Sequence, residues 1–108
     1  MFEWNNKCIE SRHHWTYGEN YKCCEKFIDK YVIEKSYENI DVLVSNLMII
    51  THIKQSSIKM KLQNIKYLFK EYKIKDTAPI SYLPNVSEEN RRAFLDVIKA
   101  KNVTIKTD

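Results

Sequence analysis

The chain has few of the residues that build turns, membrane spans or nucleotide-binding loops. Its 108 residues include one glycine and two prolines, whereas a β-sandwich or β-barrel needs many turns rich in both. A phosphate-cradling loop or a dinucleotide-binding fingerprint needs more than one glycine. The longest apolar run is Leu47–Ile50, far short of the roughly 20 residues that span a membrane. We therefore expect an all-α fold without a membrane span.

Cysteine is also scarce, and its spacing is informative. The chain has three cysteines, two of them adjacent (Cys23 and Cys24), which does not suit a disulfide framework. Cysteine is a common small apolar core residue. The alternative is a zinc site built from Cys8, His13, His14 and Cys23 or Cys24, but this spacing matches no zinc-finger pattern. We expect core thiols, no metal and no cofactor. Reduced thiols and a polar N-terminus without a secretory signal predict a cytoplasmic protein.

Apolar periodicity predicts four helices. Residues 1–14 form an N-terminal arm without a clear period. Thr16 and Glu19 have the spacing of a capping box, and the following apolar residues repeat at helical spacing, which predicts a helix over about 17–33. A second helix is expected from near Asn39 to 50–52, and a third over 57–71, capped by Ser56 or Ser57. Its apolar stripe comprises Ile58, Leu62, Ile65 and Phe69.

The remaining residues complete one domain over 1–108. Residues 15–75 form a three-helix core, two prolines mark 76–86 as a connector, and Ser87 caps a C-terminal helix over 87–101. Residues 103–105 alternate and are either a short strand or an ordered tail. Two helices, a tight polar turn and a third helix predict a three-helix helix-turn-helix (Myb-like) bundle plus a C-terminal helix.

Positive charge is concentrated in one segment. The net charge is +4. Residues 1–50 sum to −2 and residues 76–108 to zero, whereas residues 51–75 carry seven lysines and one acid, Glu71, for a sum of +6. Lysines suit phosphates, and Gln, Ser and Lys reach base edges. The alternative is a solvated lysine-rich face. The candidate nucleic-acid-binding residues are Lys54, Gln55, Ser56, Ser57, Lys59, Lys61, Gln63, Lys66 and Lys70.

Three blocks of residues carry a resemblance to a known family. They are Trp15-Thr16-x-x-Glu19, then Ser56-Ser57-Ile58-x-Met60-Lys61-Leu62-x-Asn64-Ile65, then Leu83-Pro84-Asn85-Val86-Ser87. In this order they resemble the helix-turn-helix, DNA-binding-like domain at the front of many bacterial HNH endonucleases. Gln55, Asn20 and Tyr82 depart from that family's usual Pro, Glu and Gly. The resemblance implies a DNA-binding-like domain.

The resemblance does not extend to catalysis. The family's metal-binding His-Asn-His nuclease has no counterpart, because His13, His14 and His52 do not form its pattern. We therefore expect no enzymatic activity. The recurrence of Asn64 in the family leaves its role open, and one interpretation is a packing hydrogen bond to the proline-containing connector. Met60 and Leu62 are expected to lie partly in the core.

Two functions remain open. The first is a DNA-binding protein whose helix 57–71 reads DNA, as a phage or mobile-element regulator or a recognition module. The second is a phage-encoded inhibitor that binds a host CRISPR or restriction nuclease complex, through protein or guide RNA. The oligomeric state is open. For a homodimer, the candidate contacts are Phe2, Trp4 and residues 103–105.

Overall fold

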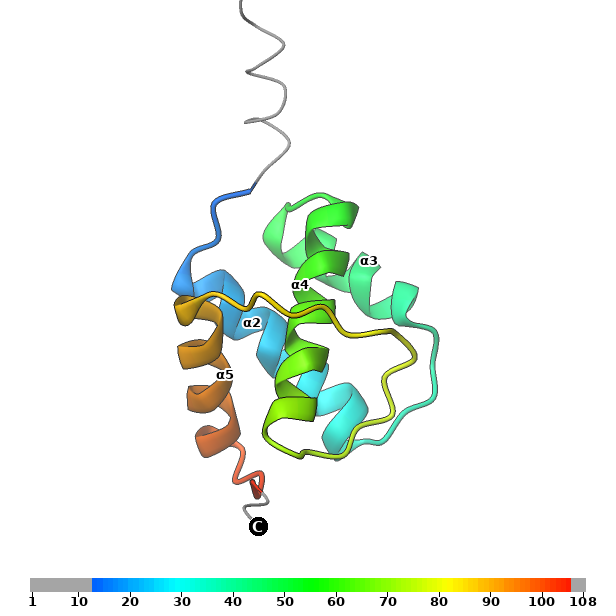
Figure 1. Ribbon diagram of the computed structural model, residues 1–108. Helices are drawn as coiled ribbons and strands as arrows, with labels where there is room; N and C mark the ends of the chain where they lie inside the picture. The colour runs from blue at the N-terminus through cyan, green and yellow to red at the C-terminus, as the bar shows by residue number, and fades with distance from the viewer. Residues whose placement is uncertain (1–12, 106–108) are drawn as a thin grey trace, which may run out of the picture.

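The computed structural model describes residues 13–105, and every regular element within that range is helical (Figure 1). Residues 1–12 and 106–108 lie outside the described part of the chain, and with them most of the predicted arm, including Phe2, Trp4 and Cys8. The all-α prediction is confirmed. The elements are α2 (Tyr17–Ile28), η1 (Asp29–Ile33), α3 (Ile40–Thr51), α4 (Gln55–Glu71) and α5 (Glu88–Ala100).

The first helical segment begins and ends where the sequence predicts. The Glu19 amide donates to the Thr16 hydroxyl at 3.1 Å, and the Thr16 amide donates to the Glu19 carboxylate at 3.1 Å. This reciprocal pair is the capping box. The last turn widens into the π-helix η1, where the Glu34 amide donates to the Asp29 carbonyl at 2.9 Å. Together α2 and η1 cover the predicted 17–33.

Side-chain caps also set the starts of α3 and α5. The Asn39 side chain accepts from the Asp41 amide at 2.8 Å, and the Ser87 hydroxyl accepts from the Asn90 amide at 3.1 Å. The α3 helix ends at His52, whose φ of 61° lies in the left-handed region. These starts confirm the predicted bounds.

The start of α4 differs from the prediction. The helix begins at Gln55, and its N-cap is Lys54, which makes no side-chain capping hydrogen bond. Ser56 and Ser57 are therefore inside the first turn, and their predicted capping role is wrong. The Ile58 amide reaches the Lys54 carbonyl at 3.1 Å, so the intrahelical ladder starts two residues earlier than expected.

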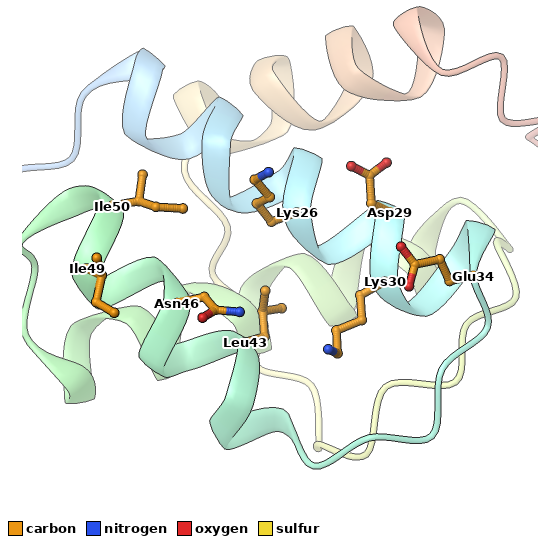
Figure 2. Close-up of a pocket in the computed structure, with 8 residues that line it drawn as sticks. All are labelled: Lys26, Asp29, Lys30, Glu34, Leu43, Asn46, Ile49 and Ile50. Atoms are coloured by element: carbon orange, nitrogen blue, oxygen red, sulfur yellow. The ribbon is translucent and has the colours of Figure 1, made fainter.

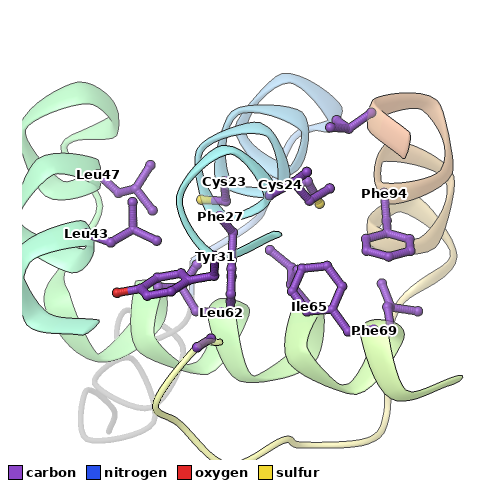
Figure 3. Close-up of a cluster of buried hydrophobic side chains, with 14 of the residues drawn as sticks. Cys23, Cys24, Phe27, Tyr31, Leu43, Leu47, Leu62, Ile65, Phe69 and Phe94 are labelled. Carbon is purple, nitrogen blue, oxygen red and sulfur yellow. The ribbon is translucent and has the colours of Figure 1, made fainter. Parts of the chain in front are cut away.

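The core lies between α2 and the helices α3, α4 and α5, and each of these three helices contacts α2. Aromatic rings link α2, α4 and α5: Phe27 and Phe69 lie 5.1 Å apart between centroids, and Phe69 and Phe94 lie 5.6 Å apart (Figure 3). Cys23 and Cys24 are fully buried among these side chains, which confirms that they are core thiols. The predicted stripe of α4, comprising Ile58, Leu62, Ile65 and Phe69, is also fully buried.

The connector (residues 76–86) runs across α4 rather than away from it (Figure 1). The Thr77 amide donates to the Tyr31 carbonyl at 3.0 Å, and the Leu83 amide donates to the Gln63 carbonyl at 3.0 Å.

Residues 103–105 form no strand, and Val103 and Ile105 pack against the core. Within residues 13–105, no helix is long and apolar enough to cross a membrane.

Candidate nucleic-acid interface

The first turns of α4 present polar side chains to solvent. Lys54, Gln55, Ser56 and Lys59 are all exposed. Met60 is also 55% exposed, although the sequence predicted that it would lie partly in the core. The only ion pair recorded for this group within residues 13–105 joins the Lys59 amine to the Asp41 carboxylate at 3.7 Å. Such an exposed pair is weak, so this end of α4 keeps its positive charge available.

The N-terminus of α4 adds to that positive charge. The first amides of a helix have no intrahelical acceptor, and the aligned peptide dipoles place partial positive charge at this end. Thr16, Asn39 and Ser87 cap the other α-helices through their side chains. At α4 no side chain does so. Its first amides therefore have no side-chain acceptor, and the exposed residues Lys54 and Lys59 belong to the same end of the helix.

The connector covers the same face of α4 further along. The Asn64 side-chain amide donates to the Leu83 carbonyl at 2.7 Å and to the Pro84 carbonyl at 3.3 Å. This confirms the packing interpretation of Asn64. The Gln63 side-chain amide donates to the Ser81 hydroxyl at 3.2 Å. Candidate residues from Gln63 onward therefore already have partners within the protein.

Lys66 and Lys70 are among these engaged residues. The Lys66 amine lies 2.6 Å from the Asp76 carboxylate and 3.1 Å from the Ala78 carbonyl. The Lys70 amine lies 4.7 Å from the centroid of the Tyr82 ring, within the range of a cation–π contact. Both lysines hold the connector against α4. Tyr82 itself is 45% exposed.

Lys61 lies on a different side of α4 from the other candidates. Its side chain is buried, at 6% exposure, and its amine lies 4.7 Å from the centroid of the Trp15 ring. Desolvation by burial lowers the pKa of Lys61 below its ordinary value of 10.5. The prediction that Lys61 belongs to an exposed basic face requires correction, because the residues before α2 fold over it. Ser57, four residues earlier on the same helix, is half-buried.

The structure therefore divides the nine candidates into groups. Four remain exposed at the start of α4, three are engaged by the connector, and Ser57 and Lys61 are withdrawn from solvent to different degrees. The sequence missed these divisions because they depend on contacts with distant residues. The four exposed candidates at the start of α4 are Lys54, Gln55, Ser56 and Lys59, whereas Lys70 is exposed but contacts the Tyr82 ring.

An exposed apolar surface on α3 was not predicted from the sequence. Ile49 is 73% exposed and Ile50 is 46% exposed. A signal was present, because α3 carries a single charged residue, Asp41. A helix with so few charges leaves apolar side chains on its outer face as well as its inner one.

Metal-ligand side chains do not gather in the described part of the chain. Within residues 13–105, no group of three or more His, Cys, Asp or Glu side chains is placed to hold a metal ion. His13 instead contacts the Glu19 carboxylate at 2.7 Å.

Comparison of the chain with protein-family models, curated protein sequences and solved structures found no match. We therefore infer function from the surface itself.

Proposed function

We propose that the protein binds double-stranded DNA through the first two turns of α4. The observation that carries the proposal is the group of exposed side chains Lys54, Gln55, Ser56 and Lys59 at an uncapped helix N-terminus. Lysine amines and free helix amides suit phosphate oxygens. Gln and Ser side chains donate to and accept from base edges.

In this proposal α3 and α4 act as a helix-turn-helix unit. They contact each other and are joined by the three residues His52–Lys54, a turn length that the motif uses. His52 takes the left-handed conformation that glycine often supplies there. The α4 helix would then enter the major groove with its N-terminal end, as recognition helices do.

The connector limits how far α4 enters. Its hydrogen bonds to α4 begin at Gln63, so the backbone of residues 81–84 lies beside the middle of the helix. Duplex DNA would contact the part of α4 that precedes Gln63. Beyond Gln63 it would contact the edge of the connector instead. Ser81 and Tyr82 are exposed there. We infer that only the start of α4 contacts bases.

A mobility-shift or anisotropy assay over a range of salt concentrations tests the proposal. A Lys54→Gln/Lys59→Gln variant removes two amines from the exposed end of α4. If both amines bind phosphates, the slope of log affinity against log salt falls by about 0.9 for each amine removed. Affinity for random-sequence duplex falls in parallel.

Lys99→Gln is the matched control, because Lys99 is an exposed lysine on α5, far along the chain from α4. This variant should leave both the affinity and the salt slope unchanged. Absence of binding to any duplex at low salt overturns the proposal. Equal loss in the control and the α4 variant overturns the assignment to α4.

A protein partner is the second candidate function, in the form of a nuclease inhibitor. The observation that favours it is the exposure of Ile49 and Ile50, since large exposed apolar side chains mark interaction surfaces. Pull-down from a host lysate, with and without nuclease treatment, separates the candidates. A nuclease complex retained after this treatment supports the inhibitor, whereas loss of all capture supports nucleic-acid binding.

A further inference from the structure

The composition of α3 differs from that of the rest of the chain. Charged residues make up 30% of the whole sequence, but α3 has one in 12 residues. Its inner face is in the core, where Ile40, Leu43, Val44 and Leu47 are buried. A helix with so little charge presents apolar side chains outside its buried face, and exposed apolar side chains often mark contacts with a partner.

The outer face of α3 is not covered within the described part of the chain. Val42 is 39% exposed and Ile49 is 73% exposed. Ser45 and Asn46 are exposed between them. These four residues follow i, i+3, i+4 and i+7 spacing, which places them on one side of the helix. The face thus has an apolar residue at each end and two polar residues in the middle.

A shallow groove of about 350 Å³ lies beside this face, between α2–η1 and α3 (Figure 2). Ile49 and Ile50 lie along one part of it, and four charged side chains of α2 and η1 lie along the other. Two of these are basic and two acidic, so the groove has no net charge. The charged lining residues are Lys26, Asp29, Lys30 and Glu34.

We propose that the outer face of α3 packs antiparallel against the same face of a second copy of this chain. In a twofold contact centred between Ser45 and Asn46, Val42 of each copy lies opposite Ile49 of the other. Ser45 then lies opposite Asn46. Each apolar residue meets an apolar residue, and each polar residue meets one that both donates and accepts hydrogen bonds.

Charge favours a second copy over an acidic or basic partner. A twofold contact brings each surface against itself, so a surface of one sign repels its copy. This surface carries both signs equally along the groove, and Asp41, at the start of α3, is 3.7 Å from Lys59 of its own chain. Self-association therefore brings no excess of either charge together.

Ser45 also suits close approach of two helices. Its small side chain allows the two backbones to come near, and the neighbouring Asn46 amide has no hydrogen bond recorded within residues 13–105. Burying an amide without a partner is costly, so the pairing of Ser45 with Asn46 across the axis would fix the register. The proposal does not depend on nucleic-acid binding.

Light scattering after size exclusion, without DNA, tests the proposal. The full chain has a mass of 13.0 kDa, and twice this mass is expected at micromolar to millimolar concentration. Val42→Asp and Ile49→Lys each place two charges against apolar groups, so each should weaken the dimer roughly tenfold or more. Ile33→Asp is the matched control, because Ile33 is 51% exposed but lies on η1.

Mixing the two α3 variants gives a sharper readout. In a mixed dimer the carboxylate introduced by Val42→Asp in one chain would face the amine introduced by Ile49→Lys in the other. The second Val–Ile pair across the axis is unchanged. The equimolar mixture should therefore dimerise more tightly than either variant alone. Circular dichroism confirms that the variants are folded, which is expected because both positions are exposed.

Cross-linking tests the register. In a Cys8→Ser background, Asn46→Cys should give a covalent dimer with a short bis-maleimide, because Cys23 and Cys24 are buried. The same background without Asn46→Cys should give none. A monomer at every concentration overturns the proposal, as does a dimer that Val42→Asp, Ile49→Lys and their mixture leave unchanged. A monomer that captures a nuclease through Ile49 also overturns the proposal, because the outer face of α3 then binds a different protein.

Discussion

The amine of Lys61 is held away from water without an opposite charge. No ion pair is recorded for it within residues 13–105, and its neighbours include the Trp15 ring and the thiols of Cys23 and Cys24. Desolvation, the largest cause, lowers its pKa from 10.5. Because the unfolded chain binds the proton more tightly than the folded chain, this residue opposes folding at neutral pH.

Replacing Lys61 should therefore stabilise the protein. We expect Lys61→Met to raise the free energy of unfolding at pH 7 by roughly 1 kcal/mol, since methionine fills similar space without a buried charge. The gain should shrink as the pH rises toward 10.5, because the wild-type amine then loses its proton in both states. Urea unfolding over this pH range measures it.

The control for this prediction is the exposed lysine two residues earlier. Lys59→Met should change the free energy of unfolding by less than about 0.5 kcal/mol at any pH. A loss of stability in Lys61→Met that is independent of pH would mean that the contact with Trp15 outweighs desolvation.

Helix starts are the clearest features at the scale of elements. Ser87 caps α5 through its hydroxyl, whereas Ser57 lies inside α4 and caps nothing. We expect Ser87→Ala to reduce the free energy of unfolding by about 1 kcal/mol. Ser57→Ala should leave it unchanged within about 0.5 kcal/mol. Equal losses in thermal or urea unfolding would contradict the observed start of α4.

Asn64 is one of the residues that hold the connector on α4. Asn64→Ala removes the donor to the Leu83 and Pro84 carbonyls, with an expected cost of about 1–2 kcal/mol in unfolding free energy. Gln63→Ala should cost less, because its hydrogen bond to Ser81 is exposed. Hydrogen exchange should show faster exchange of the Leu83 amide in Asn64→Ala. Unchanged exchange would mean that other contacts hold the connector.

Helix periodicity predicted the elements well because it is a local property. The apolar residues of α2 and α4 repeat at the helical period, and the predicted ranges agree with the structure apart from the start of α4. That start depends on how the turn after His52 leaves α3. Two serines in a row are good caps, but the backbone had already become helical at Gln55.

At the scale of the whole molecule, the core encloses the thiols of Cys23 and Cys24. Burial raises the pKa of Cys23 from 9.0 to about 12 and raises that of Cys24 as well. Unfolded thiols ionise near pH 9, whereas the folded ones stay protonated. Their contribution to stability is thus complete below pH 9 and decreases as the pH rises above it.

This predicts a measurable loss of stability in alkali. Between about pH 8 and pH 10 the two thiols should lower the free energy of unfolding by roughly 1 kcal/mol each. Urea unfolding of a Cys8→Ser chain, with and without Cys23→Ala/Cys24→Ala, isolates the effect. Native Cys23 and Cys24 should also resist thiol reagents until the chain unfolds globally. Rapid labelling in native buffer would contradict their burial.

The sequence by itself determined the helical class, the bounds of most helices, and the residues that pack inward. These follow from short-range physics: apolar spacing, capping side chains and the effects of proline. It also concentrated positive charge in residues 51–75. Only the tertiary structure decided which of those lysines meet solvent. Trp15 covers Lys61 and the connector engages Lys66 and Lys70. Such contacts join residues far apart in the chain, so no local pattern encodes them.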